Sequence, residues 1–179
     1  MNKHLQLVRE FHEKFGITQP EYPETAHLSD MDVVMRQALL MECGSETFKA
    51  IAVGDLAKIL AGLVDLAYNS LAAIACRGDD VIATSSKWRQ DGSVLSVVRV
   101  LSERINGCTS GETVHYSALY GMCEQLARGF INADFDKAFQ MVHDNLMAQT
   151  GKGGAQNYEL RIERETLPEA PDLSDALYE

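Results

Sequence analysis

Two long helical patterns, separated by only two residues, constrain the fold of this chain more than any other feature. The first extends from about Ser29 to Val53, and Ser29 followed by Asp32 resembles a capping box at its start. The second extends from Leu56 to about Cys76. Because Gly54-Asp55 leaves room only for a tight turn, the pattern predicts an antiparallel helical hairpin. The apolar side chains that share one face of the first pattern are Val34, Ala38, Met41, Phe48 and Ala52.

The rest of the chain also favours helices. Residues 3–15, 93–106, 113–129 and 134–149 each carry apolar side chains at spacings of three and four. The one stretch that resembles a strand is Tyr158 to Ile162. We therefore predict an all-α fold with a four-helix-type core, built from antiparallel hairpins, and an extra helical hairpin.

Charge limits the classes of partner. The formal net charge is −10, and no run of basic residues is longer than two. Such a chain repels nucleic acid and anionic membranes, so we expect neither as a partner. The apolar stretch from Leu56 to Cys76 contains Lys58, Asp65 and Asn69, which argues against a membrane helix. No signal peptide opens the sequence, and we expect a cytoplasmic location.

Three carboxylates stand where the hairpin would bring them together. Glu42 and Glu46 are four residues apart on the first helix and share a face. Asp65 lies within an apolar run of the second helix, at a height similar to that of Glu46. Such a set suits a hard cation, Mg²⁺ with Mn²⁺ as a substitute, that also binds a phosphate ligand. An ordinary solvated face for the two glutamates and a buried ion pair for Asp65 are the structural alternatives.

This arrangement resembles the MazG-like all-α nucleoside triphosphate pyrophosphohydrolases, of the phosphoribosyl-ATP pyrophosphohydrolase type. Members have a Glu-Glu-x-x-Glu helix, a tight turn and a Glu-x-x-Asp helix. Glu42 and Glu46 take the first and third acids here, Gly54-Asp55-Leu56 takes the turn, and Asp65 closes the second motif. The resemblance covers residues 5–76 and about 134–150. It implies a single domain over residues 1–150 with an insertion at about 79–130. Pro168, Pro171 and many acids predict an extended or partly disordered tail over 151–179.

Two positions depart from the family pattern. Cys43 replaces the second Glu of the first motif, and Gly62 replaces the Glu of the second motif. Half of the expected ligand set is therefore absent. The site could be degenerate, could retain weak or altered chemistry, or could recruit an acid from the insertion. The candidates for that substitution are Glu103, Glu112 and Glu124.

The resemblance implies a Mg²⁺-dependent hydrolase that cleaves a nucleoside triphosphate to the monophosphate and pyrophosphate. Glu46 and Asp65 would hold the ion and Glu42 would support it. A catalytically inactive relative that binds nucleotide or serves in assembly is the alternative. The family usually assembles as dimers or tetramers, so we expect a homodimer or homotetramer. The side chains assigned to substrate binding are Lys49, Asn69, His143 and Asn145, although Lys49 and Lys58 would equally pair with Glu46 and Asp55.

Overall fold

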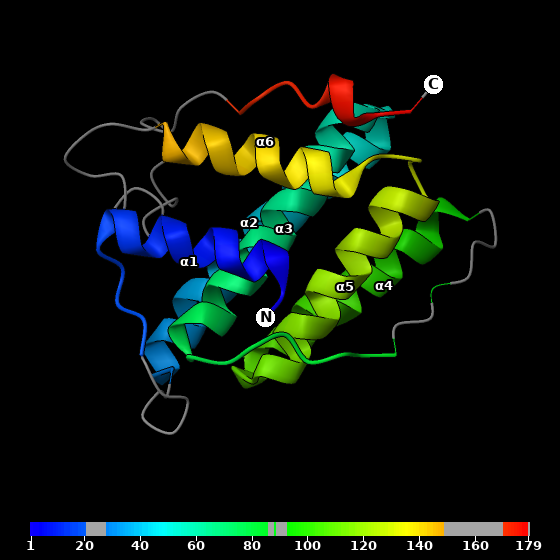
Figure 1. Cartoon of the computed structure of the whole chain (residues 1–179). Coiled ribbons are helices and arrows are strands. Elements are labelled where there is room, and N and C mark those ends of the chain that lie inside the picture. The colour runs from blue at the N-terminus through cyan, green and yellow to red at the C-terminus, as the bar shows by residue number, and fades with distance from the viewer. Residues whose placement is uncertain (21–27, 86–87, 89–92, 149–169, 179) are drawn as a thin grey trace.

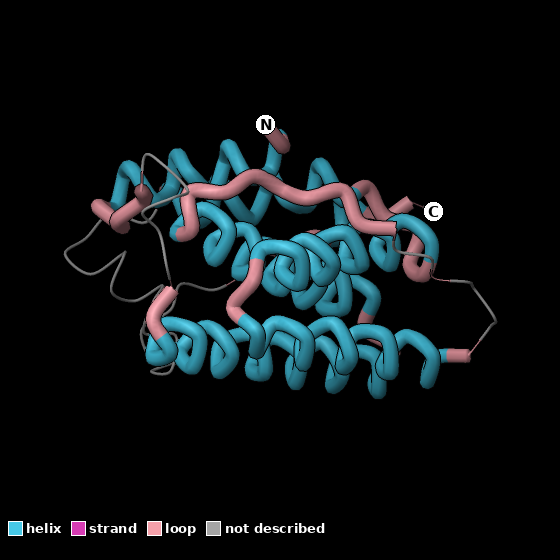
Figure 2. Tube along the Cα trace, turned by 90° about the horizontal axis from the view of Figure 1, so that it is seen from below, coloured by secondary structure: helices cyan, strands magenta, loops and turns pink. Residues whose placement is uncertain are grey.

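The computed structural model describes residues 1–20, 28–85, 88, 93–148 and 170–178, and most of these residues lie in helices (Figure 1). Within them there is no strand, only an isolated bridge between Ala133 and Leu177 (Figure 2). The all-α prediction is confirmed, while Tyr158 to Ile162 lies outside the described residues. The elements are α1 (Lys3–Phe15), α2 (Asp30–Val53), α3 (Leu56–Cys76), α4 (Val94–Gly107), η2 (Cys108–Ser110), α5 (Thr113–Gly129), α6 (Phe135–Met147) and η4 (Ser174–Ala176).

Local capping signals fix the ends of α2 and α3. The Ser29 hydroxyl accepts from the Asp32 amide at 3.1 Å, and the Asp32 carboxylate accepts from the Ser29 amide at 3.0 Å. This is the capping box that the sequence predicts. Gly54 ends α2 in the left-handed region, at a φ of 74°. The Asp55 carboxylate then accepts from the Lys58 amide and starts α3.

The six helices pack as three layers of two (Figures 1 and 2). α1 and α6 form one outer layer, α3 and α5 the middle layer, and α2 and α4 the other outer layer. The predicted extra hairpin, α4 and α5, is therefore part of the core, because α5 lies in the middle layer beside α3. It contributes side chains that are fully buried, such as Tyr116, Leu119 and Met122.

α3 is the central helix of the domain. It is long and apolar enough for a membrane span, yet most of it is buried inside the protein. The apolar side chains of α3 pack against the other helices of the domain. The helix therefore acts as a core helix, which agrees with the sequence argument against a membrane span.

α2 turns a different face inward from the one that its apolar residues predict. Val34 and Met41 are 59% and 58% exposed, so the predicted face is wrong as a core face. The residues of α2 that are buried are Leu39, Leu40, Cys43, Gly44, Thr47 and Ala50. The small residues Cys43, Gly44, Thr47 and Ala50 let α2 approach its neighbours closely, whereas Val34 and Met41 remain exposed.

The closest approach between α2 and α3 is at Thr47 and Gly62. A Cβ atom added to Gly62 would lie 2.1 Å from Thr47 Oγ1, 2.9 Å from Thr47 Cβ and 3.1 Å from Thr47 Cα. Thr47 is fully buried, and its hydroxyl donates to the Cys43 carbonyl oxygen at 2.7 Å. Only glycine fits at position 62 in this packing.

The end of the chain is docked onto the domain. We call Ala170–Tyr178 the C-terminal strap. Leu173 and Ala176 of the strap are each 1% exposed, and the Asp134 amide donates to the Ala176 carbonyl oxygen at 2.7 Å. The predicted extended or partly disordered tail lies outside the described residues over 151–169. The strap is irregular apart from η4, and two apolar anchors and backbone hydrogen bonds hold it against the domain.

Candidate active site

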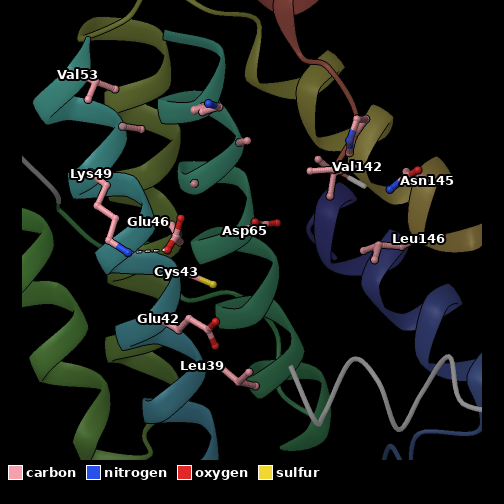
Figure 3. A pocket seen from close by; sticks show the side chains of 16 residues that line it. Leu39, Glu42, Cys43, Glu46, Lys49, Val53, Asp65, Val142, Asn145 and Leu146 are labelled. Carbon is pink, nitrogen blue, oxygen red and sulfur yellow. Dashed lines mark hydrogen bonds and ion pairs between the residues drawn. The ribbon is translucent and has the colours of Figure 1, made fainter. Parts of the chain in front are cut away.

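One pocket, with a volume of about 600 Å³, lies between α2, α3 and α6. That volume is in the range of about 300–1,000 Å³ that small-molecule sites occupy. Glu42 and Glu46 on α2 and Asp65 on α3 all line it (Figure 3). The structure therefore brings together the three carboxylates that the sequence singles out. The complete lining is Leu39, Glu42, Cys43, Glu46, Lys49, Ala50, Val53, Lys58, Ala61, Gly62, Asp65, Val142, Asn145, Leu146, Ala170 and Pro171.

Two lysines stand at the end of the pocket near the hairpin turn. Lys49 Nζ lies 3.0 Å from Glu46 Oε1, with the two side chains 70% and 44% exposed. Lys58 Nζ lies 3.4 Å from Asp55 Oδ2. Both ion pairs are those that the sequence offers as the alternative to phosphate binding. Exposed pairs of this kind are worth only about 0–1 kcal/mol, so either ammonium group can turn toward an anionic ligand at little cost.

Asn69 does not line the pocket, but it contacts residues that do. Its side chain is buried, and Nδ2 donates to the Asp65 carbonyl oxygen at 2.8 Å. The same Nδ2 lies 3.6 Å from Cys43 Sγ. Asn69 thus links the backbone that carries Asp65 to the residue that replaces a family acid. This geometry fits a positioning role better than the predicted contact with substrate.

The side of the pocket opposite the carboxylates is formed by α6 and the C-terminal strap. Val142, Asn145 and Leu146 face the carboxylates across the pocket in Figure 3, and Ala170 and Pro171 continue the same side. The predicted substrate residue Asn145 is therefore in the pocket. Of these five side chains only Asn145 is polar, and none is charged.

His143, also predicted to bind substrate, points into the core instead. It is 3% exposed, and its Nδ1 lies 3.1 Å from the Tyr68 hydroxyl. Burial lowers the pKa of His143, although Glu10, 4.0 Å away, acts in the opposite direction. This is the satisfied core histidine that its sequence position allows as an alternative.

None of the three acids that the sequence offers as substitutes completes the carboxylate set. Glu103, Glu112 and Glu124 are all absent from the pocket lining, and Glu124 pairs with Arg128 at 2.9 Å. Recruitment of a substitute acid is therefore contradicted. Among the described residues, no three His, Cys, Asp or Glu side chains converge closely enough to hold a metal ion.

The residues present nevertheless suit a cation that arrives with a phosphate ligand. Mg²⁺ usually keeps several waters and is held by one or two carboxylates together with substrate phosphates. Glu46 and Asp65, on neighbouring helices, supply two carboxylates to one pocket. The donors are oxygen atoms, as a hard cation prefers. A closed site made only of protein ligands does not fit, because Cys43 and Gly62 leave it short of acids.

Sequence reasoning missed the apolar side of the pocket. Val142 and Leu146 belong to the apolar stripe of α6, which gives no sign that one edge of the stripe faces a pocket. Ala170 and Pro171 reach the site only because the C-terminal strap docks more than 20 residues beyond α6. No local sequence pattern near Ala170 and Pro171 predicts that contact.

An all-α hairpin whose two helices present carboxylates to one pocket suits metal-assisted phosphate chemistry. Residues 8–82 match the family model of phosphoribosyl-ATP pyrophosphohydrolase. This segment is thus a domain of the MazG-like all-α pyrophosphohydrolase superfamily, whose members typically depend on a divalent metal ion. The matched range contains α2, α3 and the three carboxylates, whereas α4, α5, α6 and the strap lie outside it. Comparison with curated proteins and with solved structures gives no match.

Proposed function

We propose that the pocket binds a nucleoside triphosphate with Mg²⁺ or Mn²⁺ and hydrolyses it to the nucleoside monophosphate and pyrophosphate. The observation that carries the proposal is that Glu42, Glu46 and Asp65, from two helices, line one pocket together with two lysines. The family match of the segment that bears these residues supports the same reaction class. One water molecule is consumed at the bond between the α and β phosphates.

Each residue has a part in this proposal. Glu46 and Asp65 would hold the cation, which supplies charge neutralisation on the phosphates and activation of water. Glu42, one helical turn before Glu46, adds negative charge that favours the cation. Binding of a cation by Glu46 would release Lys49 from its exposed ion pair, and the ammonium group could then bind a phosphate oxygen. Asn69 keeps the Asp65 segment of α3 in place through its hydrogen bond to the backbone.

The alternative is a protein that binds nucleotide without turnover. The packing of Thr47 against Gly62 favours it, because an acidic side chain at position 62 has no room. The relatives' full ligand set cannot be rebuilt at that position without moving α2 away from α3. Retention of two carboxylates and two lysines in the pocket suits binding equally well.

The experiment is a hydrolysis assay of the purified protein with a panel of ribo- and deoxynucleoside triphosphates and Mg²⁺ or Mn²⁺. Pyrophosphate and phosphate are separated. We expect pyrophosphate release that Asp65→Asn abolishes, because the substitution keeps the shape and removes the charge. Glu103→Gln, which removes an exposed acid outside the pocket, is the matched control and should leave the rate unchanged. Release that survives Asp65→Asn contradicts the proposal, and nucleotide binding without turnover establishes the alternative.

We also propose that the protein is a homodimer or homotetramer. The outer face of α2 leaves Met41 exposed beside a groove of about 580 Å³ that Phe48 and Ile105 also line. Val94 and Leu95 at the start of α4 are 49% and 54% exposed. Light scattering coupled to gel filtration tests the assembly, and a monomer at micromolar concentration would contradict it.

A further inference from the structure

The two sides of the pocket have different chemistry and come from different parts of the chain. α2 and α3 supply all its carboxylates and lysines, within the matched range. We name the other side the neutral wall, and it comes from beyond that range. Its residues are Val142, Asn145, Leu146, Ala170 and Pro171.

The strap is held firmly enough to make the neutral wall a lasting part of the pocket. The Tyr178 amide donates to the Asn132 carbonyl oxygen at 3.1 Å, and Lys137 Nζ donates to the Asp175 carbonyl oxygen at 2.7 Å. Leu173, two residues after Pro171, is buried as an anchor. These contacts fix the chain direction just where Pro171 meets the pocket.

The composition of the neutral wall selects the part of a ligand that it can contact. A phosphate group loses hydration against Val142 and Leu146, which line the pocket without charge, and gains no cation in return. A flat, uncharged group gains from the same surface, because apolar area leaves water on both partners. The Asn145 amide offers both a donor and an acceptor at the edge of such a group.

We infer that the neutral wall, completed by the C-terminal strap, binds the nucleoside part of the ligand and determines which nucleotides the pocket accepts. This rests on the proposed function for the phosphate side. The carboxylates and lysines of α2 and α3 hold the cation and the phosphates. The base or sugar lies across the pocket on Pro171, Val142 and Leu146, and Asn145 reads its polar edge. Specificity is thus carried by α6 and the strap, whereas the chemistry is carried by the hairpin.

The test compares a nucleotide analogue with a polyphosphate that lacks the nucleoside. Dissociation constants are measured by calorimetry with Mg²⁺ for an α,β-methylene nucleoside triphosphate, which resists hydrolysis, and for inorganic tripolyphosphate. The full chain is used with Asn145→Ala, and with Leu173→Asp, which places a charge at a buried anchor and undocks the strap. Asp175→Asn is the matched control, since the strap uses the backbone of Asp175 and its side chain is exposed.

We expect each of the two variants to weaken the nucleotide by about tenfold, the lower end of what the loss of one contact in a pocket costs. Tripolyphosphate should stay within about twofold, and the control should change neither ligand. Equal weakening of both ligands, or no change in either, overturns the inference. Asn145→Ala leaves the strap docked, so it decides the matter if Leu173→Asp fails to fold.

The outcomes separate the inference from the proposed function. Selective loss of the nucleotide in a protein that shows no hydrolysis keeps the neutral wall and overturns the hydrolase. Wild-type protein that binds tripolyphosphate as tightly as the nucleotide overturns the neutral wall and leaves the phosphate site standing. Wild-type protein that binds neither ligand overturns both.

Discussion

Replacing Gly62 by alanine tests the contact that shapes the site. The added Cβ would lie 2.1 Å from Thr47 Oγ1 and 3.1 Å from Thr47 Cα. Rotation of the hydroxyl can relieve only the first contact, because the second involves backbone. Overpacking of a core costs about 1–3 kcal/mol, and the backbone contact places this case near about 3. The gain in helix propensity from Gly to Ala returns about 1 kcal/mol, so we expect a net loss of about 2 kcal/mol.

The free energy of unfolding, measured by urea denaturation followed by circular dichroism, checks this value. Gly44→Ala is the matched control, because Gly44 lies within α2 as Gly62 lies within α3, and its added Cβ meets only Ile105 Cδ1, at 2.8 Å. That atom is the tip of a flexible side chain and can move, so the control should change stability by less than about 1 kcal/mol. Thr47→Ala should rescue part of the Gly62→Ala loss, since it removes the nearest atom. If Gly62→Ala is as stable as the wild type, the close approach of α2 and α3 is refuted. The steric explanation for the missing acid would then fail as well.

Two further predictions concern buried titratable groups. Burial, aided by Arg36 and Arg9, lowers the pKa of His12 from 6.5 to about 3, so stability present above pH 6.5 is lost as the pH falls toward 3. Between pH 6.5 and 5 the unfolding free energy of the wild type should therefore fall by about 2 kcal/mol more than that of His12→Leu, at about 1.4 kcal/mol per pH unit. Urea denaturation at the two pH values measures both losses, and equal losses would contradict the assignment. Brief iodoacetamide treatment with peptide mapping should modify Cys76 first, because it is half-buried, whereas burial raises the pKa of the Cys108 thiol to about 12. Equally fast labelling of Cys108 would show that this thiol is accessible.

The sequence predicts the hairpin well because its signals are local. The capping box at Ser29 and the tight turn at Gly54-Asp55 each act within a few residues, and both occur where the pattern places them. The register of the two helices follows from the length of the turn. Glu46 and Asp65 could therefore be placed beside one pocket before any packing was known.

The inward face of α2 and the docking of the strap depend on contacts between distant parts of the chain, which short sequence patterns do not predict. Apolar residues surround much of α2, so periodicity does not decide whether Met41 or Cys43 faces inward. Close packing decides it, since Thr47 can approach Gly62 only when the small side chains face the core. In the same way, Leu173 anchors the strap by a contact with a distant part of the chain. Apart from Asn145, the neutral wall was missed for this reason, although the carboxylates opposite it were found.

The contact between Thr47 and Gly62 also limits how the site can change. Of the two positions where the family acids are missing, Gly62 is closed by backbone and side-chain atoms of α2. Cys43 is different, because it lines the pocket and is 8% exposed. A further carboxylate can therefore enter the set at Cys43 without moving the helices apart, but not at Gly62. The neutral wall is independent of both positions, since it lies on α6 and the strap. Under the proposed function, substitutions there should alter which nucleotide binds, while the carboxylates remain in place.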